Sequence, residues 1–130
     1  MIALDTSSLV AYLSNETGRD VEAVEMALTE RQACLPPAVL AELLSDPKLP
    51  AATAELFRQL PILPGTEGYW ERVGALRADV IARGRKARLA DALIAQSCLD
   101  HGVPLITRDP DFRNLARVRD LELLLERGTH

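Results

Sequence analysis

Hydrophobic positions along the chain follow two alternating patterns. Short runs of consecutive apolar residues predict buried strands at Ile2 to Leu4, Ala33 to Leu35, Pro61 to Leu63, Pro104 to Thr107 and Leu121 to Leu125. Between these runs, apolar residues recur at the spacing of a helix face. This spacing predicts helices at Ser8 to Leu13, Val21 to Thr29, Pro37 to Leu44, Ala51 to Gln59, Tyr69 to Arg83, Leu89 to His101 and Phe112 to Ala116. Such alternation is typical of an α/β fold with a mainly parallel sheet.

Proline and glycine stand at the expected boundaries of these elements. Pro37 follows another proline and can occupy the first turn of a helix, and Gly102 follows a predicted helix where a C-terminal glycine belongs. No repeat or low-complexity linker divides the 130 residues, and a hydrophobic content of 48% is ordinary for a globular core. We therefore expect a single domain that covers residues 1–130.

The overall charge of the chain limits how it can meet a nucleic acid. Nineteen acidic and fifteen basic side chains leave a net charge of -4, so the molecule as a whole does not attract polyanions. Any nucleic-acid contact needs a local basic patch. No apolar run approaches the roughly 18 residues of a membrane span, and the first residues do not resemble a signal peptide. We expect a cytoplasmic protein with no membrane contact and with Cys34 and Cys98 as reduced core residues.

Four acidic residues stand in positions where parallel α/β sheets bind ligands. Asp5 follows the first predicted strand and Asp109 follows the fourth, and the carboxyl ends of parallel strands lie at one edge of the sheet. Glu42 and Asp91 lie on helices that leave this same edge. We expect the four carboxylates to converge there.

Asp91 is the most informative of the four acids. The residues one and two helical turns after it are Ile94, Ala95 and Cys98, so its stripe of the helix is apolar or small. A carboxylate on a buried stripe needs a charged partner or a metal ion. Glu42 lies only at the flank of an apolar stripe, and its signal is weaker.

Each acid also has an ordinary structural interpretation. Asp5 and Asp109 can cap the helices that follow them, Asp91 can be a first-turn acid favoured by the helix dipole, and Glu42 can be a half-exposed surface residue. Convergence favours function, because gathered carboxylates repel one another unless a cation neutralises them. Ligands made of oxygen alone suit Mg²⁺ or Mn²⁺. Such an ion can bind a phosphodiester oxygen and lower the pKa of a bound water, which is the chemistry of a phosphodiesterase.

Basic and hydroxyl side chains near these acids complete the candidate site. Four positive charges lie between positions 83 and 88 and lead into the helix of Asp91. They are either a solvated loop or a rim that grips phosphates. The residues that we expect to bind RNA are Arg85, Lys86, Arg88 and Arg108. Ser7 and Thr107 supply hydroxyls that can bond to a carboxylate or cap an element.

Four segments taken together resemble one family. They are Ile2-Ala3-Leu4-Asp5-Thr6-Ser7, Glu42 within Ala38-Val39-Leu40-Ala41-Glu42-Leu43, Asp91-Ala92-Leu93-Ile94-Ala95, and Leu105-Ile106-Thr107-Arg108-Asp109-Pro110-Asp111-Phe112. In order and spacing they closely resemble the PIN-domain ribonucleases, specifically VapC-type toxins. The resemblance covers nearly the whole chain.

The resemblance implies a fold and a site. The fold is a PIN-like domain whose five-stranded parallel sheet carries helices on both faces. The site is an acidic pocket that binds Mg²⁺ or Mn²⁺ and cleaves RNA. By position, Asp5 and Asp91 resemble the principal metal ligands, and Glu42 and Asp109 complete the set. Relatives place the fourth acid at either of two positions, so Asp111 is held in reserve behind Asp109.

The resemblance also implies partners. The family usually acts as a homodimer and is silenced by a cognate antitoxin protein. Two other functions stay open. The chain could be a non-catalytic PIN-like module that binds RNA or protein. It could also be a phosphohydrolase with Asp5 as nucleophile, although Ser7 stands where such enzymes carry a second aspartate.

Overall fold

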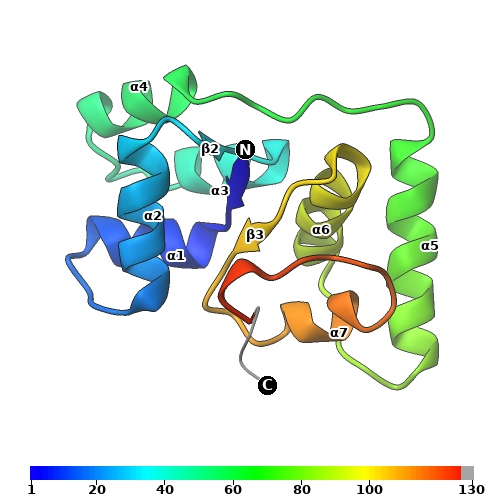
Figure 1. The fold of residues 1–130 in the computed structure, drawn as a ribbon. Helices are drawn as coiled ribbons and strands as arrows, with labels where there is room; N and C mark the ends of the chain where they lie inside the picture. The colour runs from blue at the N-terminus through cyan, green and yellow to red at the C-terminus, as the bar shows by residue number, and fades with distance from the viewer. Residues whose placement is uncertain (127–130) are drawn as a thin grey trace.

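The computed structural model describes residues 1–126 and places a short parallel sheet among helices (Figure 1). Its three strands are β1 (Ile2–Leu4), β2 (Ala33–Cys34) and β3 (Leu105–Ile106), in the order β2-β1-β3. In register, Ile2 pairs with Ala33, and Ala3 pairs with Leu105. The first strand of the chain therefore lies in the middle of the sheet, which places Asp5 between the ends of its two neighbours.

The prediction of five strands is wrong in number. The other two predicted segments each contribute one parallel bridge, Leu35 with Ile62 and Leu105 with Leu123, at the two edges of the sheet. Pro61 and Pro64 flank Ile62, and proline has no N–H to extend a ladder. Beyond Leu123 the chain turns into a 3₁₀ helix, η1 (Leu124–Glu126). All five predicted segments therefore lie side by side and parallel, but the two at the edges make single bridges and are too short to be strands.

Helix positions agree closely with the sequence pattern. The helices are α1 (Thr6–Leu13), α2 (Arg19–Thr29), α3 (Pro37–Leu44), α4 (Ala51–Gln59), α5 (Tyr69–Ala82), α6 (Leu89–His101) and α7 (Phe112–Ala116). The predicted bounds of α3, α4, α6 and α7 are confirmed, and α1 and α2 begin two residues earlier than expected. Prolines at the starts of α3 and α4 and the left-handed Gly102 after α6 explain why these boundaries are sharp.

The hydrophobic core lies around the sheet and α6. Ala3, Leu4, Leu105 and Ile106 are completely buried on the strands. Helix α6 packs against α3, α5 and α7, so it carries buried residues on several of its sides. Because α6 is central, the carboxylate of its first turn is held among core elements. Cys34 and Cys98 are buried free thiols, and burial raises the pKa of both. Within residues 1–126, we find no helix long and apolar enough to cross a membrane.

Candidate metal centre

Asp91 stands in the first turn of α6 with its carboxylate buried. The residue is 8% exposed, and its Oδ2 atom has no hydrogen-bond partner among the residues that the structure describes. Leaving a buried carboxylate oxygen without a partner is costly. The sequence predicted that a carboxylate on this stripe needs a charged partner or a metal ion, and within residues 1–126 no group donates a hydrogen bond to Oδ2.

Two further carboxylates lie against Asp91. Asp109 and Asp111 belong to the loop between β3 and α7, and one oxygen of each lies within 4.8 Å of the other and of an Asp91 oxygen. The loop is bent by a local bond in which the Asp111 N–H donates to Asp109 Oδ1 at 2.9 Å. Lys86 Nζ lies 3.6 Å from Asp111 Oδ2. The structure therefore brings both candidates for the fourth acid into one cluster with Asp91.

Asp5 follows β1 and is held by two hydroxyl groups. It is 4% exposed, and its Oδ2 accepts hydrogen bonds from Ser7 Oγ at 2.6 Å and from Thr107 Oγ1 at 2.7 Å. The same Thr107 oxygen accepts the Asp109 N–H at 3.0 Å. Thr107 thus connects Asp5 to the backbone of Asp109, across 102 positions of the chain. Sequence analysis singled out both hydroxyls.

The neighbouring acids contribute to a raised pKa at Asp91. The pKa of Asp91 is raised to about 6, mainly by burial and further by the negative charges of Asp109 and Asp5, while the charge of Arg88 acts in the opposite direction. Burial also raises the pKa of Asp5, although the hydroxyls of Ser7 and Thr107 act in the opposite direction. The protein alone leaves these carboxylates poorly compensated, which is the electrostatic condition that a bound cation relieves.

This electrostatic arrangement predicts how stability depends on pH. The pKa of Asp91 is about 6 in the folded chain, above its ordinary value of 3.8. Protonation of Asp91 therefore stabilises the folded chain fully below pH 3.8, and this stabilisation is lost as the pH rises through 6. Between about pH 4 and pH 7, in chelator, the free energy of unfolding of wild type relative to Asp91→Asn should fall by on the order of 2 kcal/mol.

Urea denaturation of both proteins at several pH values measures this difference. Taking the difference cancels the opposite trend from Asp20 and Asp100, whose pKa values are lowered by hydrogen bonds from Arg108 and Arg72. A difference that stays flat over this range would contradict the burial of Asp91 among other acids.

Glu42 lies at the margin of this arrangement. It is exposed on α3, outside the group formed by Asp91, Asp109 and Asp111. Its Oε1 accepts a hydrogen bond from Thr6 Oγ1 at 2.8 Å, and Thr6 directly follows Asp5. The structure therefore links Glu42 to the start of α1 and does not bring it into the three-carboxylate cluster. Sequence analysis did not identify Thr6 as this link.

The four basic residues expected to bind RNA divide into two groups. Arg85, Lys86 and Arg88 are exposed in the segment before α6, where Lys86 lies near Asp111 and the charge of Arg88 acts on Asp91. Arg108 is engaged elsewhere, because Asp20 accepts hydrogen bonds from its Nε at 2.8 Å and its Nη2 at 3.0 Å. Arg108 Nη1 also lies 3.0 Å from Glu16 Oε1. An RNA contact by Arg108 stays a prediction, and its observed contacts anchor the loop after β3 to α2.

Asp20 is a structural residue that sequence analysis missed. It is 7% exposed, and besides Arg108 its Oδ2 accepts a hydrogen bond from Ser8 Oγ at 2.9 Å. An acid in the first turn of a helix is common, so the sequence carried no signal for this role. Because Arg108 stands between Thr107 and Asp109, its contacts with the Asp20 carboxylate fix the loop that carries both residues to the candidate metal centre.

Removing the Asp20 carboxylate should cost stability. Asp20→Ala leaves the Arg108 guanidinium and the Ser8 hydroxyl without their buried acceptor, and we expect a loss of about 2 kcal/mol in the free energy of unfolding. Asp79→Ala is the matched control, since Asp79 pairs with Arg119 at 2.8 Å while both side chains are well exposed. The loss of unfolding free energy in Asp79→Ala should stay below about 1 kcal/mol. Equal losses in urea denaturation would show that the buried pair does not anchor the loop.

Comparison with known proteins identifies the fold. A family model described as PIN domain matches residues 2–118. Among solved structures, VapBC2 from Rickettsia felis bound to a promoter DNA fragment superposes with a TM-score of 0.74 and 23% identity, over 95% of this chain and 97% of that one. VapBC-5 from Mycobacterium tuberculosis, of the VapBC family of toxin-antitoxin systems, gives 0.68 and 23%, over 94% and 95%. At these identities the likeness is one of fold. No curated protein matches the chain in sequence.

Proposed function

The chain belongs to the PIN domain family, and on that premise we propose that it is a metal-dependent endoribonuclease that serves as the toxin of a toxin-antitoxin pair. The observation that carries the proposal is the buried Oδ2 of Asp91, which has no partner in the described part of the chain and lies in a cluster of carboxylates. A purely structural role for Asp91 would leave this oxygen uncompensated.

The residues present fit Mg²⁺ or Mn²⁺. Asp91 and Asp109 offer oxygens within 4.8 Å of each other, and Asp111 offers a third. Asp5 lies close enough for its charge to raise the pKa of Asp91. Carboxylate oxygens without histidine or cysteine are the ligands that these hard cations prefer. We propose Asp5, Asp91 and Asp109 as the ligands, with Asp111 in reserve and Glu42 at the margin.

The chain's own residues then have distinct parts in phosphodiester hydrolysis. A bound divalent cation supplies neutralising charge for the phosphodiester and lowers the pKa of water. Ser7 and Thr107 orient Asp5 by donating to its Oδ2. Glu42, which accepts a hydrogen bond from Thr6, would orient water at the edge of the site. Lys86 and Arg88 lie beside the acids, and together with the exposed Arg85 they would hold the RNA phosphates.

The proposed partners follow from the neighbouring structures. These are VapBC structures, and VapBC-5 belongs to a family of toxin-antitoxin systems, which supports a cognate antitoxin for this chain. An antitoxin that covers the acids would block RNA from the site. A homodimer stays a prediction from the resemblance.

Cleavage of unstructured RNA tests the proposed function. Purified wild type is incubated with the RNA and Mn²⁺, beside Asp5→Asn, Asp91→Asn and a wild-type sample with chelator. We expect cleavage only by the wild type with metal. Equal cleavage by wild type and both variants would point to a contaminating nuclease and contradict the proposal.

A further inference from the structure

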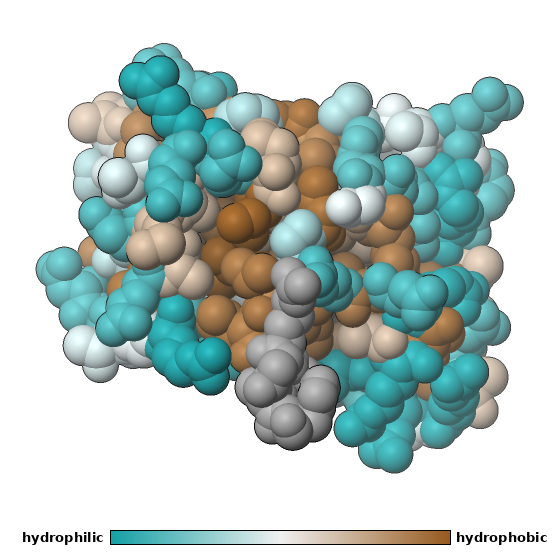
Figure 2. Space-filling view, in the orientation of Figure 1, coloured by the Kyte–Doolittle hydropathy of each residue, from teal (hydrophilic) through white to brown (hydrophobic). Residues whose placement is uncertain are grey.

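The connection between α5 and α6, residues 83–88, carries four basic side chains and is called the basic segment below. After α5, Gly84 takes a left-handed conformation with φ 74° and turns the chain toward α6. Figure 2 shows largely hydrophilic surface at the lower right of this face, where Figure 1 has the basic segment. Within residues 1–126, no backbone N–H donates to the carbonyl oxygens of Lys86 and Ala87. Helix or strand bonding therefore does not fix the middle of the basic segment.

Two side chains supply the donors that these carbonyl groups need. Asn114 on α7 donates from Nδ2 to the Lys86 oxygen at 3.2 Å, and Arg77 on α5 donates from Nε to the Ala87 oxygen at 2.9 Å. Ala87 is itself 8% exposed and belongs to the hydrophobic core. Backbone carbonyl groups in folded proteins are nearly always paired, so these two bonds hold the chain in one course. The backbone is thus fixed between Lys86 and Arg88.

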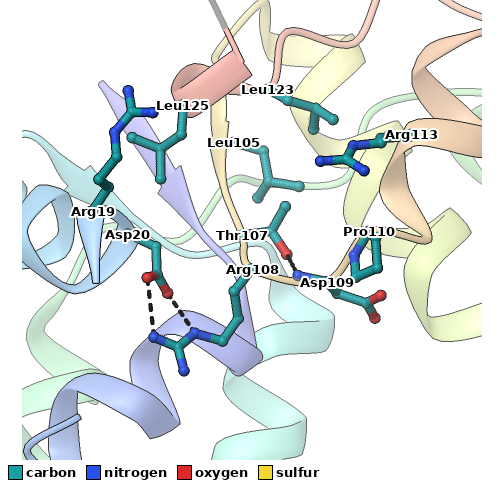
Figure 3. Close-up of a pocket in the computed structure, with 10 residues that line it drawn as sticks. All are labelled: Arg19, Asp20, Leu105, Thr107, Arg108, Asp109, Pro110, Arg113, Leu123 and Leu125. Atoms are coloured by element: carbon teal, nitrogen blue, oxygen red, sulfur yellow. Dashed lines mark hydrogen bonds and ion pairs between the residues drawn. The ribbon is translucent and has the colours of Figure 1, made fainter. Parts of the chain in front are cut away.

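Asn114 also belongs to the part of the chain that carries the acids. Its backbone N–H donates to the Asp111 carbonyl oxygen at 3.1 Å. Lys86 therefore meets this part of the chain twice, through its carbonyl oxygen at Asn114 and through its Nζ, 3.6 Å from Asp111 Oδ2. On the other side of the loop, Arg108 is bonded to Asp20 (Figure 3). The acid loop is thus joined to α2 on one side and to the basic segment on the other.

A fixed backbone changes what the basic side chains can do. Lysine and arginine lose conformational freedom when they hold a phosphate, and this loss weakens binding. The loss is smaller when the backbone beneath them is already ordered in the right place. Arg88 directly precedes α6, and its charge acts on Asp91. A phosphate held by Lys86 and Arg88 would therefore lie next to the acids.

We propose that Asn114 and Arg77 are positioning residues for RNA binding. By holding the carbonyl oxygens of Lys86 and Ala87, they place the Lys86 and Arg88 side chains where they can grip a phosphate beside the acids. The inference rests on the proposed function for the identity of the ligand as RNA. It adds to that function two residues that act through the basic segment and not through contact with the RNA or the ion.

Asn114→Leu tests the proposal without changing any charge, because leucine has a similar size and no donor. Fluorescence anisotropy measures its affinity for a short, unstructured RNA labelled with fluorescein, at low salt and in chelator so that cleavage does not interfere. We expect binding about fivefold weaker than in the wild type, the factor that one ordinary hydrogen bond is worth.

His101→Phe is the matched control for a purely structural loss. His101 Nε2 donates to the Pro64 carbonyl oxygen at 2.8 Å, so this variant loses the same kind of bond at the opposite end of α6 from the basic segment. Both variants should unfold at lower urea concentration than the wild type. Only Asn114→Leu should bind RNA more weakly.

A double-mutant cycle separates positioning from a general effect. In a chain that already carries Lys86→Gln, adding Asn114→Leu should weaken RNA binding by less than about twofold, because the side chain that Asn114 positions is gone. The same cycle applies to Arg77→Met with Arg88→Gln. Losses that simply add in this second cycle would mean that Arg77 acts through its own charge, which overturns its part in the proposal.

The outcomes for the proposal and for the proposed function can be told apart. RNA affinity of Asn114→Leu at the wild-type value, or a loss of equal size with and without Lys86, overturns the positioning, while metal-dependent cleavage by the wild type still supports a nuclease. Coupled losses of RNA affinity support the positioning even where no cleavage is found. A wild-type protein that binds no RNA contradicts both.

Discussion

Replacing Asp91 with asparagine is expected to lower the rate of RNA cleavage by at least about 100-fold. Loss of a residue that only hydrogen-bonds a metal ligand already costs up to about 100-fold, and Asp91 is proposed as a ligand itself. Asparagine keeps the shape of the side chain but removes the charge that faces Asp109 and Asp111. Because Oδ2 has no hydrogen-bond partner within residues 1–126, it is the atom that most needs a cation, and its loss should weaken metal binding more than any single neighbouring change.

Cleavage rates at saturating RNA and Mn²⁺ measure this effect. Asp46→Asn is a suitable control, since Asp46 is an exposed acid whose Oδ1 accepts the Lys48 N–H at 2.9 Å, and it is not one of the clustered carboxylates. Its rate should equal that of the wild type. The asparagine variant at position 91 should also unfold at higher urea concentration than metal-free wild type near neutral pH. A variant that loses activity by unfolding would show the opposite shift.

Thr107→Val should weaken Mn²⁺ binding by about 10-fold to 100-fold, as expected for the loss of a group that orients a metal ligand. Valine has nearly the same shape as threonine but cannot donate to Asp5 Oδ2 or accept the Asp109 N–H. The change therefore disturbs two parts of the site through one atom. Calorimetric titration with Mn²⁺ measures the affinity.

Thr107→Ser separates the hydroxyl from the shape of the side chain. Serine keeps an oxygen that can make both hydrogen bonds, so its affinity for Mn²⁺ should stay near that of the wild type. If valine bound Mn²⁺ as tightly as threonine, the hydroxyl would not position Asp5. If serine bound as weakly as valine, packing of the methyl group would be the cause.

The helices could be predicted well because their signals are local. Pro37 and Gly102 mark helix ends through their own backbone chemistry, and the apolar stripe of α6 can be read from its own residues. The number of strands could not be predicted in the same way. Ile62 and Leu123 lie where edge strands would pair, but the length of the ladder depends on the chain on either side.

The candidate site could be predicted in part for a similar reason. Asp91 and Asp109 come together because strand order and the direction of α6 determine where they lie, and Thr107 joins Asp5 to the backbone of Asp109. The partners of Arg108 depend on a side chain 88 positions away in the chain, so the local sequence favoured a phosphate contact while the structure has an ion pair with Asp20. The position of Glu42 was harder to predict than those of the other acids. It depends on the rotation of α3 about its axis, which the apolar stripe of α3 specifies only loosely.

Crystals grown with Mn²⁺ test the central claim most directly, because anomalous scattering locates the ion without reference to activity. The account predicts one strong anomalous peak among the carboxylates of Asp5, Asp91 and Asp109, at about 2 Å from their oxygens. It also predicts that the peak disappears in Asp91→Asn crystals. Wild-type crystals with no peak among these carboxylates, or an unchanged peak in the variant, would contradict it.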